Sequence, residues 1–393
     1  MKSKWATKKL GDKEYFEILG SGIERFEGEK EYLSTSSIEG NKIIVLECKI
    51  TYQKRPSRAN MQPRLNSVWF ARMINTIKVY SFTENNKDEI DKYILSTGFA
   101  GILCNPEKVD PRYLEKIFLS KWFNDLKDSL ASDKAIQKSL NNDDIANLEI
   151  PIPPLPIQQK IVKILDTIQE AIDIHDKIIE KTKELKKSLM AELFKYGGPS
   201  FRKGRKLKKT EIGEIPEDWE VVRLGKILIL SNGARPEFDE EGIFPVYGAN
   251  GIMGKSKKFL VNNEYTLIIG RVGASGEINL ASGKIWISDN ALYTSEVDKE
   301  KIYLPFLKDY LLWRNLKQFA DRSTHPIITQ TFLKNFKITL PPIPEQQEIA
   351  EILQTVDQKI DIERRKKELY EELFKTMLNK IMNQEIDVES VDF

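Results

Sequence analysis

The side chains in this sequence that could do chemistry are mostly cations and amides. Arg, Lys, Asn and Gln can hydrogen-bond to base edges in a DNA groove, and Arg and Lys also contact phosphates. These residues gather in three runs, which are Arg55, Arg58, Asn60, Gln62, Arg64, Arg72 and Lys78; Arg235, Asn250, Lys255, Lys257, Lys258 and Arg271; and Arg322, His325 and Gln330. We interpret the runs as candidate DNA contacts, with solvated surface or a structural ion pair as the alternative for each residue. Sequence alone does not separate base contacts from phosphate contacts.

Patterns typical of catalysis or metal binding are weak. Residues 249–256 match a loose phosphate-binding loop, but the residues after them predict a strand or turn instead of the helix that such a loop needs. His175 and His325 are the only histidines, and neither has a metal-ligand pattern around it. Both Pro-Pro pairs precede Leu or Ile, so a methyltransferase motif is missing. We therefore predict a non-catalytic chain with no metal and no cofactor of its own.

Composition sets broad limits on the class of protein. The 393 residues are too many for one ordinary core, and 61 basic against 59 acidic residues give no net-charge argument for nucleic acid. Cys48 and Cys104 form no disulfide or zinc pattern, which fits a reducing compartment. The sequence has no apolar run long enough for a signal peptide or a membrane span. These features predict a cytoplasmic protein with at least two domains.

The clearest feature is an internal repeat. Residues 153–173 read PPLPIQQKIVKILDTIQEAID, and residues 341–361 read PPIPEQQEIAEILQTVDQKID, an offset of 188 residues. A shorter match, Trp-x4-Leu-Gly, begins at Trp5 and again at Trp219. The stretch between Trp and Pro-Pro is 26 residues longer in the first copy. The unit thus predicts a constant scaffold that carries two different domains.

Each Pro-Pro pair is followed by a pattern typical of a coiled-coil helix. Apolar residues recur about every 3.5 positions, and charged residues fill the other faces. A helix of roughly 38 residues would be about 57 Å long. We expect the two helices to pair antiparallel about a pseudo-twofold axis; two amphipathic helices in separate bundles are the alternative. His175 and Glu363 fall on equivalent core positions, so we expect a polar pair that fixes register, unless both face water.

The predicted fold is α+β, with two α/β recognition domains separated by a long antiparallel two-helix coiled coil. The expected divisions are a first domain over 1–150, a long helix over 151–200, a second domain over 201–340 and a second long helix over 341–393. Strands are expected at Lys42–Ile50, Ser67–Phe70, Ile77–Phe82, Val221–Leu230, Tyr265–Ile269 and Lys284–Ile287, and helices at Pro111–Ser129 and Leu304–Phe319.

A basic segment lies between the first long helix and the second domain. Six of the eight residues in 202–209 are Arg or Lys. We interpret the segment as a solvated linker, with a phosphate-contacting segment as the alternative.

Several segments together resemble the specificity subunits of type I restriction–modification systems. They are the two PP-x-P-x-QQ-x-I motifs, residues 212–219 (IGEIPEDW), 244–254 (FPVYGANGIMG), 268–276 (IIGRVGASG) and 55–64 (RPSRANMQPR). The resemblance covers nearly the whole chain, and the paired PP-x-P-x-QQ motifs are its most specific part. The first domain departs from it, since it keeps only Trp-x4-Leu-Gly of the IGEIPEDW approach and has Ile157 where the second copy has Glu345.

The resemblance implies a complex. Two target-recognition domains would each bind one half of a split, asymmetric site in double-stranded DNA, and the helices would set the spacer. Two methyltransferase subunits would dock on the scaffold and bring S-adenosylmethionine, and restriction subunits would add ATP-driven translocation and cleavage. The polar motifs Gln158–Gln159 and Gln346–Gln347, expected to be unpaired, favour partner docking at two equivalent places.

Two other classes of protein stay open. One is an autonomous DNA-binding protein with no methyltransferase partner, and the other is a coiled-coil adaptor whose domains bind protein. Methylation mapping with the partner subunit present distinguishes them most directly, because it returns a bipartite site only for a specificity subunit.

Overall fold

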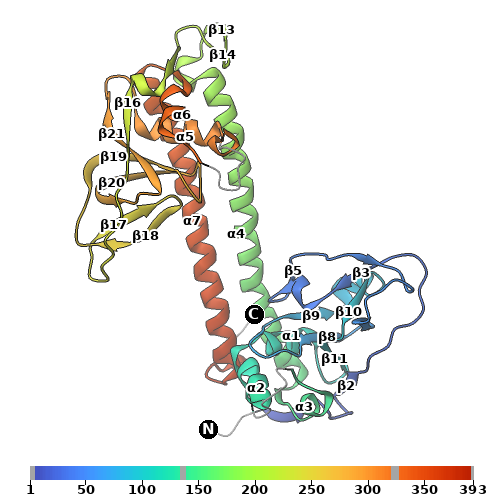
Figure 1. Ribbon diagram of the computed structural model, residues 1–393. Coiled ribbons are helices and arrows are strands. Elements are labelled where there is room, and N and C mark those ends of the chain that lie inside the picture. Colours follow the sequence, from blue (N-terminus) through green and yellow to red (C-terminus); the bar gives the residue numbers. More distant parts are fainter. Residues whose placement is uncertain (1–4, 133–138, 320–326, 391–393) are drawn as a thin grey trace. The chain divides into compact units, whose positions relative to one another are not determined.

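The computed structural model describes residues 5–132, 139–319 and 327–390, and by internal contacts the chain forms two units. The first unit spans 1–175 with 366–393, and the second spans 176–365. Two long helices, α4 (Leu155–Tyr196) and α7 (Ile343–Met382), each contribute to both units (Figure 1). Each unit is therefore a mixed α/β domain together with a segment of each long helix.

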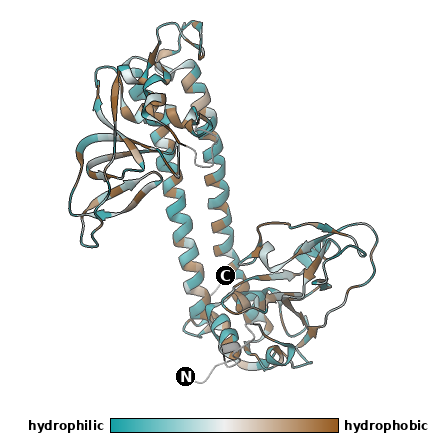
Figure 2. Cartoon of the chain, in the orientation of Figure 1, coloured by the Kyte–Doolittle hydropathy of each residue, from teal (hydrophilic) through white to brown (hydrophobic). Residues whose placement is uncertain are grey.

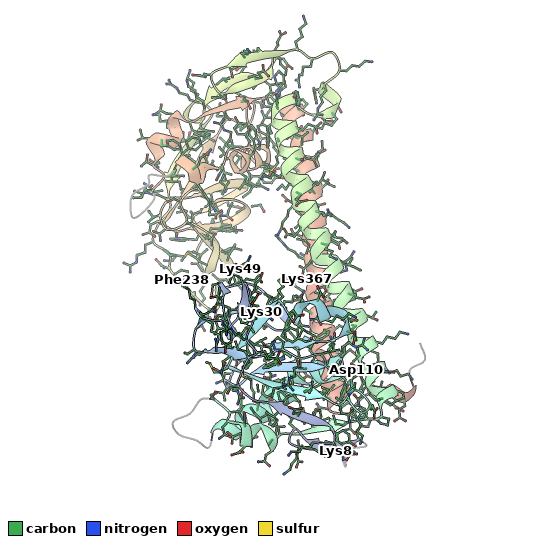
Figure 3. The ribbon with its side chains drawn as sticks, turned by 90° about the vertical axis from the view of Figure 1, so that its right-hand side faces the viewer. Lys8, Lys30, Lys49, Asp110, Phe238 and Lys367 are labelled. Carbon is green, nitrogen blue, oxygen red and sulfur yellow. The ribbon has the colours of Figure 1, made fainter. Side chains whose placement is uncertain are left out.

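The first unit is built mainly on two four-stranded sheets, with strand orders β6-β3-β10-β7 and β2-β11-β8-β9. Its strands are β1 (Ala6–Lys9), β2 (Phe16–Leu19), β3 (Lys30–Leu33), β4 (Ile38–Glu39), β5 (Lys42–Ile43), β6 (Lys49–Ile50), β7 (Ala59–Met61), β8 (Ser67–Ala71), β9 (Val79–Phe82), β10 (Tyr93–Ser96), β11 (Phe99–Cys104) and β12 (Glu149–Ile152), and its shorter helices are α1 (Pro111–Leu119), α2 (Lys121–Ser132) and α3 (Asn142–Ala146). Asp110, which Figure 3 labels, caps α1 by accepting a hydrogen bond from the Arg112 backbone through its side chain. Phe70 of β8 packs edge-on against Phe118 of α1 and Phe123 of α2, which joins the sheet to these helices.

The second unit has a larger sheet, with six strands in the order β16-β21-β19-β20-β17-β18. Its strands are β13 (Leu207–Thr210), β14 (Gly213–Pro216), β15 (Glu220–Arg223), β16 (Leu228–Asn232), β17 (Phe244–Gly248), β18 (Gly251–Ser256), β19 (Val261–Gly270), β20 (Ile278–Ile287), β21 (Ala291–Val297) and β22 (Lys337–Leu340), and its shorter helices are α5 (Leu304–Trp313) and α6 (Gln330–Asn335). Phe194 of α4 packs against Phe306 and Tyr310 of α5, so the domain core is continuous with the long helix.

The long helices pack together antiparallel, as each unit shows by itself. In the first unit Ile161 and Leu165, near the start of α4, share a core with Leu378 and Ile381, near the end of α7. In the second unit Leu193, near the end of α4, shares a core with Ile349 and Leu353, near the start of α7. Figure 2 shows apolar and polar residues interspersed along both helices, as expected for amphipathic helices. The predicted combination of two mixed α/β domains with two long helices that pack together is confirmed.

The Trp-x4-Leu-Gly repeat forms the same local structure in both units. After Trp5, β1 pairs antiparallel with β12, and after Trp219, β15 pairs antiparallel with β22. The Leu of the motif then donates its backbone N–H across the pair, from Leu10 to Leu148 at 2.9 Å and from Leu224 to Phe336 at 3.0 Å. The repeat therefore includes a two-stranded clamp that closes each domain beside the start of a long helix.

Some predicted elements are interrupted. The strand expected over Lys42–Ile50 is two short strands, β5 and β6, with exposed Ile44, Val45 and Leu46 between them. The strand expected over Val221–Leu230 is broken by a 3-10 turn at Leu224–Lys226, where the chain leaves the clamp and joins the six-stranded sheet. Apolar content predicted both stretches, but pairing partners decided where the strands end.

The expected helices are also divided. The one over Pro111–Ser129 is two helices, α1 and α2, which meet at Ser120. The one over Leu304–Phe319 is α5, which ends at Trp313, and then a 3-10 turn over Leu316–Phe319.

Candidate nucleic-acid interface

The polar run of the first domain lies in and around β7. Arg58 and Arg64 are exposed, while Asn60 and Gln62 are half-buried. Arg55 packs on the ring of Tyr52, with 4.2 Å from its guanidinium carbon to the ring centroid, and also donates to the Tyr52 carbonyl. Arg64 pairs with Glu17 at 3.6 Å, so the run offers the exposed cation Arg58 and two amides together with a cation whose charge is partly offset.

Arg72 and Lys78 are held inside the first domain. Arg72 donates to the carbonyls of Phe99 at 2.9 Å and Leu140 at 3.3 Å and to the Asn142 side chain at 2.8 Å. Burial lowers the pKa of the Arg72 guanidinium. Lys78 donates to the Thr35 carbonyl at 2.5 Å. These contacts give both side chains a structural role, which the sequence did not reveal.

Two of the lysines expected to contact DNA in the second domain are paired with carboxylates. Lys257 lies 3.0 Å from Asp239 and 2.9 Å from Glu241, and Lys258 lies 2.9 Å from Glu237. The hydrogen bond from Lys257 lowers the pKa of Asp239. Hydrogen bonds to Glu241 and, less strongly, to Asp239 raise the pKa of Lys257. This acidic loop offsets the charge that a phosphate contact would use.

Other cations and amides of the second domain meet where several strands end. Gly270 approaches the turn at Ala249 so closely that an added Cβ would lie 2.8 Å from the Ala249 carbonyl oxygen. Arg271 donates its backbone N–H to the Asn290 carbonyl at 2.9 Å, and its guanidinium reaches Asn232 at 3.4 Å. Arg235, Asn250 and Lys255 are exposed, and no ion pair involving Arg235, Lys255 or Arg271 occurs in the described part of the chain.

Two further residues of this group, Asn232 and Asn290, were not predicted from the sequence. Asn232 ends β16, and Asn290 precedes β21; both are exposed. A lone Asn in a turn is usually there for the turn itself, so only the tertiary arrangement indicates them.

The last predicted run is only partly described. Gln330 begins α6, is exposed and donates to the Leu230 carbonyl at 3.0 Å. Arg322 and His325 lie outside the described residues. The segment that resembles a phosphate-binding loop forms the turn and second strand of the β17–β18 hairpin, with no helix directly after it. Residues 249–256 therefore lack the strand–loop–helix frame of a phosphate-binding loop, as predicted from the sequence.

One cation of the basic segment between α4 and the second domain, Arg205, forms an ion pair with the buried Glu345. Glu345, fully buried, accepts from Arg205 at 2.7 Å, from the Trp219 indole at 2.9 Å and from the Gly198 backbone at 3.0 Å. Arg205 also binds Asp218 and thereby lowers the pKa of that carboxyl. Arg205 is therefore structural, and the linker interpretation does not apply to it.

The Arg205–Glu345 ion pair also explains how the two copies differ. In the first copy Ile157 takes the place of Glu345 and packs, with Trp5, against the apolar core of its unit. An apolar residue there needs no Arg partner, so the first copy has no need of the longer IGEIPEDW approach.

The two glutamine pairs divide into buried and exposed members. Gln158 accepts from the Asp110 backbone at 2.9 Å and donates to the carbonyls of Lys108 and Pro153 at 2.9 and 2.8 Å. Gln346 accepts from Tyr303 and donates to Lys301 and Pro341, each at 2.8 Å. The expectation that Gln158 and Gln346 are unpaired is wrong, because both are fully buried and hold a loop to the helix start.

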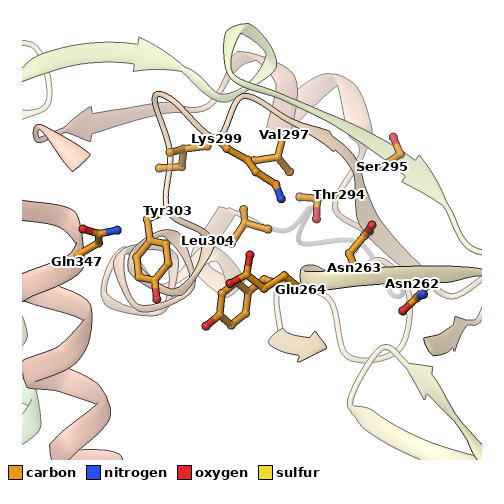
Figure 4. Close-up of a pocket in the computed structure, with 12 residues that line it drawn as sticks. Asn262, Asn263, Glu264, Thr294, Ser295, Val297, Lys299, Tyr303, Leu304 and Gln347 are labelled. Carbon is orange, nitrogen blue, oxygen red and sulfur yellow. The ribbon is translucent and has the colours of Figure 1, made fainter. Parts of the chain in front are cut away.

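Gln159 and Gln347 are exposed, and each lines a pocket. Figure 4 shows the pocket of the second unit, where Gln347 and Tyr303 lie side by side. Its volume is about 500 Å³, and Asn263, Glu264 and Lys299 also line it. Gln159 lines a pocket of about 320 Å³ in the first unit, beside Asp110 and Arg112. Exposed side chains at equivalent places thus remain candidates for partner contact.

His175 does not lie free in solvent. It is half-buried, and its ring stacks on Tyr370 with 5.4 Å between ring centroids. Glu363 is buried and pairs with Lys359 at 2.6 Å. A polar pair of His175 with Glu363 stays a prediction.

Two features are absent from the described residues. These residues contain no group of His, Cys, Asp and Glu side chains arranged to hold a metal ion. None of their helices combines the length and hydropathy needed to cross a bilayer.

Comparison with known families decides the identity of the chain. The family model described as type I restriction modification DNA specificity domain matches residues 2–184 and 216–372. The chain belongs to the type I specificity subunits. The resemblance seen in the sequence, and with it the interpretation as a DNA specificity subunit and not a catalytic subunit, is confirmed.

Individual specificity subunits agree with this assignment. A protein of Methanocaldococcus jannaschii described as the MjaX type I restriction enzyme specificity subunit is 30% identical over 309 residues, covering 73% of this chain and 70% of its own length. The MjaVIII specificity subunit of the same organism is 31% identical over 276 residues, covering 63% of this chain and 64% of its own.

Solved structures show the same fold. One, from work on assembly and conformational transition of a type I system, superposes with a TM-score of 0.60 at 21% identity, covering 96% of this specificity subunit and 97% of that chain. The specificity subunit from M. genitalium gives a TM-score of 0.56 at 17% identity, covering 97% and 96%.

Proposed function

We propose that this specificity subunit binds double-stranded DNA with both domains, each contacting one half of a bipartite, asymmetric site. The observation that carries the proposal is the contrast between the repeated and the unrepeated parts. The β1–β12 and β15–β22 clamps and the buried glutamines recur, whereas the sheets attached to them differ in strand number and order. A constant scaffold with different domains suits two unlike half-sites. The predicted domain divisions at 150, 200 and 340 belong to this proposal.

The long helices would set the spacer between the half-sites. α7 has 40 residues and α4 has 42. At about 1.5 Å per residue a 40-residue helix is about 60 Å long, which equals the length of roughly 18 base pairs. Since an α-helix is stiff over this length, its residue count fixes a distance.

Two methyltransferase subunits would dock at equivalent places on the helices. The first unit exposes Ile174 of α4 and Leu373 of α7, at 55% and 43% exposure. The second exposes their counterparts at the 188-residue offset, Ile362 at 49% and Leu185 at 53%. Apolar side chains on a charged helix surface indicate a protein contact. Gln159 and Gln347, on the first turns of the same helices, would add a polar contact in each copy.

The chemistry would belong to the partners. The methyltransferase subunits would bind S-adenosylmethionine and transfer the methyl group, and restriction subunits, in complexes that include them, would translocate and cleave DNA. The specificity subunit would direct both activities without a cofactor of its own. A cytoplasmic location follows from this proposal, since the DNA and the partners are there.

Methylation mapping tests the proposal. The chain is co-produced with the methyltransferase subunit of its own system, and modified bases in a random DNA library are located by sequencing. We expect a split consensus with two unlike halves and a fixed spacer. DNA binding without methyltransferase association would support an autonomous DNA-binding protein, and failure to bind DNA at all would support an adaptor; either result would contradict the proposal.

A second experiment tests the docking surface. We expect Ile174→Ser with Ile362→Ser to reduce the number of methyltransferase subunits bound, measured by light scattering on the purified complex, because each loses an apolar contact. Gln159→Ala with Gln347→Ala should weaken docking without changing thermal stability. Ile44→Ser, at 55% exposure outside the helices, is the matched control and should leave the stoichiometry unchanged.

A further inference from the structure

Three polar residues of the second unit lie together at the ends of its strands. Asn232 ends β16, Arg271 follows β19, and Asn290 lies in the turn between β20 and β21. Backbone hydrogen bonds hold these segments in contact, from Gly233 to Ala291 at 3.1 Å and from Arg271 to Asn290 at 2.9 Å. We refer to Asn232, Arg271 and Asn290 as the amide–arginine cluster.

The surroundings of the cluster suit base edges better than phosphates. The turn Ser288–Asn290 contains no cation, and its exposed Asp289 would repel a phosphate. The amide of Asn290 has no hydrogen-bond partner among the described residues, although its backbone is fixed by Ser288 and Arg271. The charge of Asp289 therefore disfavours a phosphate beside the exposed amide of Asn290, whereas an uncharged base edge can hydrogen-bond to that amide.

Arg271 is half-buried, and its side chain is oriented by a hydrogen bond. Its Nη1 donates to Asn232 Oδ1 at 3.4 Å, and it forms no ion pair in the part of the chain that the structure describes. Lys257 and Lys258 of the same unit are each paired with carboxylates. Arg271 thus keeps the remaining N–H groups of its guanidinium fork available for a ligand.

We propose that the amide–arginine cluster determines part of the half-site of the second domain, with Arg271 and Asn290 contacting base edges and Asn232 positioning Arg271. The inference rests on the proposed function and adds the chemistry of recognition to it. Arg pairs in bidentate fashion with guanine O6 and N7, and Asn pairs with adenine N6 and N7. The half-site of this domain therefore contains a guanine and an adenine in the major groove that depend on these side chains.

Methylation mapping of single variants tests the cluster in the complete complex. A duplex library with both half-sites randomised is methylated by wild type and by Asn290→Ala, Asn232→Ala and Arg271→Ala. We expect Asn290→Ala to lose roughly ten- to a hundredfold of the preference for adenine at one base pair of one half-site. Asn232→Ala should weaken the same guanine preference that Arg271→Ala removes, and should add nothing to Arg271→Ala. Asn232→Gln should restore part of it.

Two controls separate this role from others. Asn335→Ala makes the same chemical change at an exposed position on α6 and should leave every preference unchanged. Lys255→Ala should lower binding to all sequences and reduce the salt dependence. Asn290→Ser serves as a second variant if thermal unfolding shows that Asn290→Ala is poorly folded.

The outcomes distinguish failure of the amide–arginine cluster from failure of the proposed function. If wild type methylates a bipartite site and the cluster variants keep its preference at every position, the cluster has no role in recognition. The cluster also has no role in recognition if the variants lose methylation of all sequences equally. If wild type methylates no bipartite site, the proposed function fails first, and the inference fails with it.

Discussion

Lys127 of α2 shows how one buried cation shapes the first domain. Its side chain is almost fully buried, and its Nζ donates to the carbonyls of Thr76 at 2.7 Å and Met73 at 3.2 Å. Desolvation lowers the pKa of Lys127 from 10.5 to about 8. The charge of Lys127 therefore costs stability near neutral pH while its hydrogen bonds hold the loop.

Lys127→Met should remove a pH dependence of stability. Because the folded pKa is about 8 and the unfolded one about 10.5, the unfolded chain binds more protons between these values, so raising the pH from 8 to 10.5 stabilises wild type. The gain relative to Lys127→Met should approach about 3 kcal/mol. Urea unfolding of both proteins at pH 7 and pH 10 measures it. A difference between them that does not change with pH would contradict this cause.

Arg205 should matter for stability more than the other cations of its segment. Arg205→Met leaves Glu345 buried with only two N–H donors, so we expect a loss of about 3 kcal/mol in the free energy of unfolding. Adding Glu345→Ile, the residue found at position 157 of the first copy, should recover part of it. Denaturant unfolding checks both. Lys203→Met, an exposed neighbour, is the matched control. An equal loss there would show that the Arg205–Glu345 ion pair is not the cause.

At the scale of elements, the glycine of each Trp-x4-Leu-Gly motif marks a close approach between the clamp and a short helix. A Cβ on Gly11 would lie 3.0 Å from Ala146 of α3, and one on Gly225 would lie 3.0 Å from the Lys334 carbonyl oxygen of α6. Ala146 and Lys334 are themselves equivalent at the 188-residue offset. The motif therefore records a packing requirement that both domains share.

Gly11→Ala and Gly225→Ala should each destabilise the chain. The added methyl group meets backbone that cannot move without shifting a helix, so we expect a loss of about 1–3 kcal/mol for each. Thermal or urea unfolding measures the effect. Gly20→Ala is the control, because no atom lies within 4 Å of its added Cβ. If all three variants unfold alike, the close approach is not what requires glycine.

At the scale of the whole molecule, the length of the helices should determine the DNA spacer. Inserting one heptad into both α4 and α7, at equivalent positions, adds about 10 Å while keeping the coiled-coil pattern. We expect the spacer to widen by about three base pairs, which methylation mapping would show. Insertion into one helix alone breaks the pairing and should abolish methylation. An unchanged spacer after the double insertion would contradict the proposed role of the helices.

The sequence by itself determined the scaffold. The repeat at an offset of 188 residues and its apolar spacing can be recognised without the structure. The reason is that helix period and coiled-coil pattern are local properties of the chain. The runs of Arg, Lys, Asn and Gln also marked parts of a candidate interface. The motifs at Trp5 and Trp219 marked the positions of the two-stranded clamps. The sequence did not show that the strands after them, β1 and β15, pair with β12 and β22.

Only the tertiary structure decided what single polar residues do. Gln158 and Gln159 are adjacent in sequence, yet one is buried with three hydrogen bonds and the other is exposed. Arg205 and Lys257 look like their basic neighbours until Glu345 and Asp239 are placed beside them. Asn290 becomes a candidate only next to Arg271. Burial and charge pairing depend on residues distant in the chain, so no local pattern carries them.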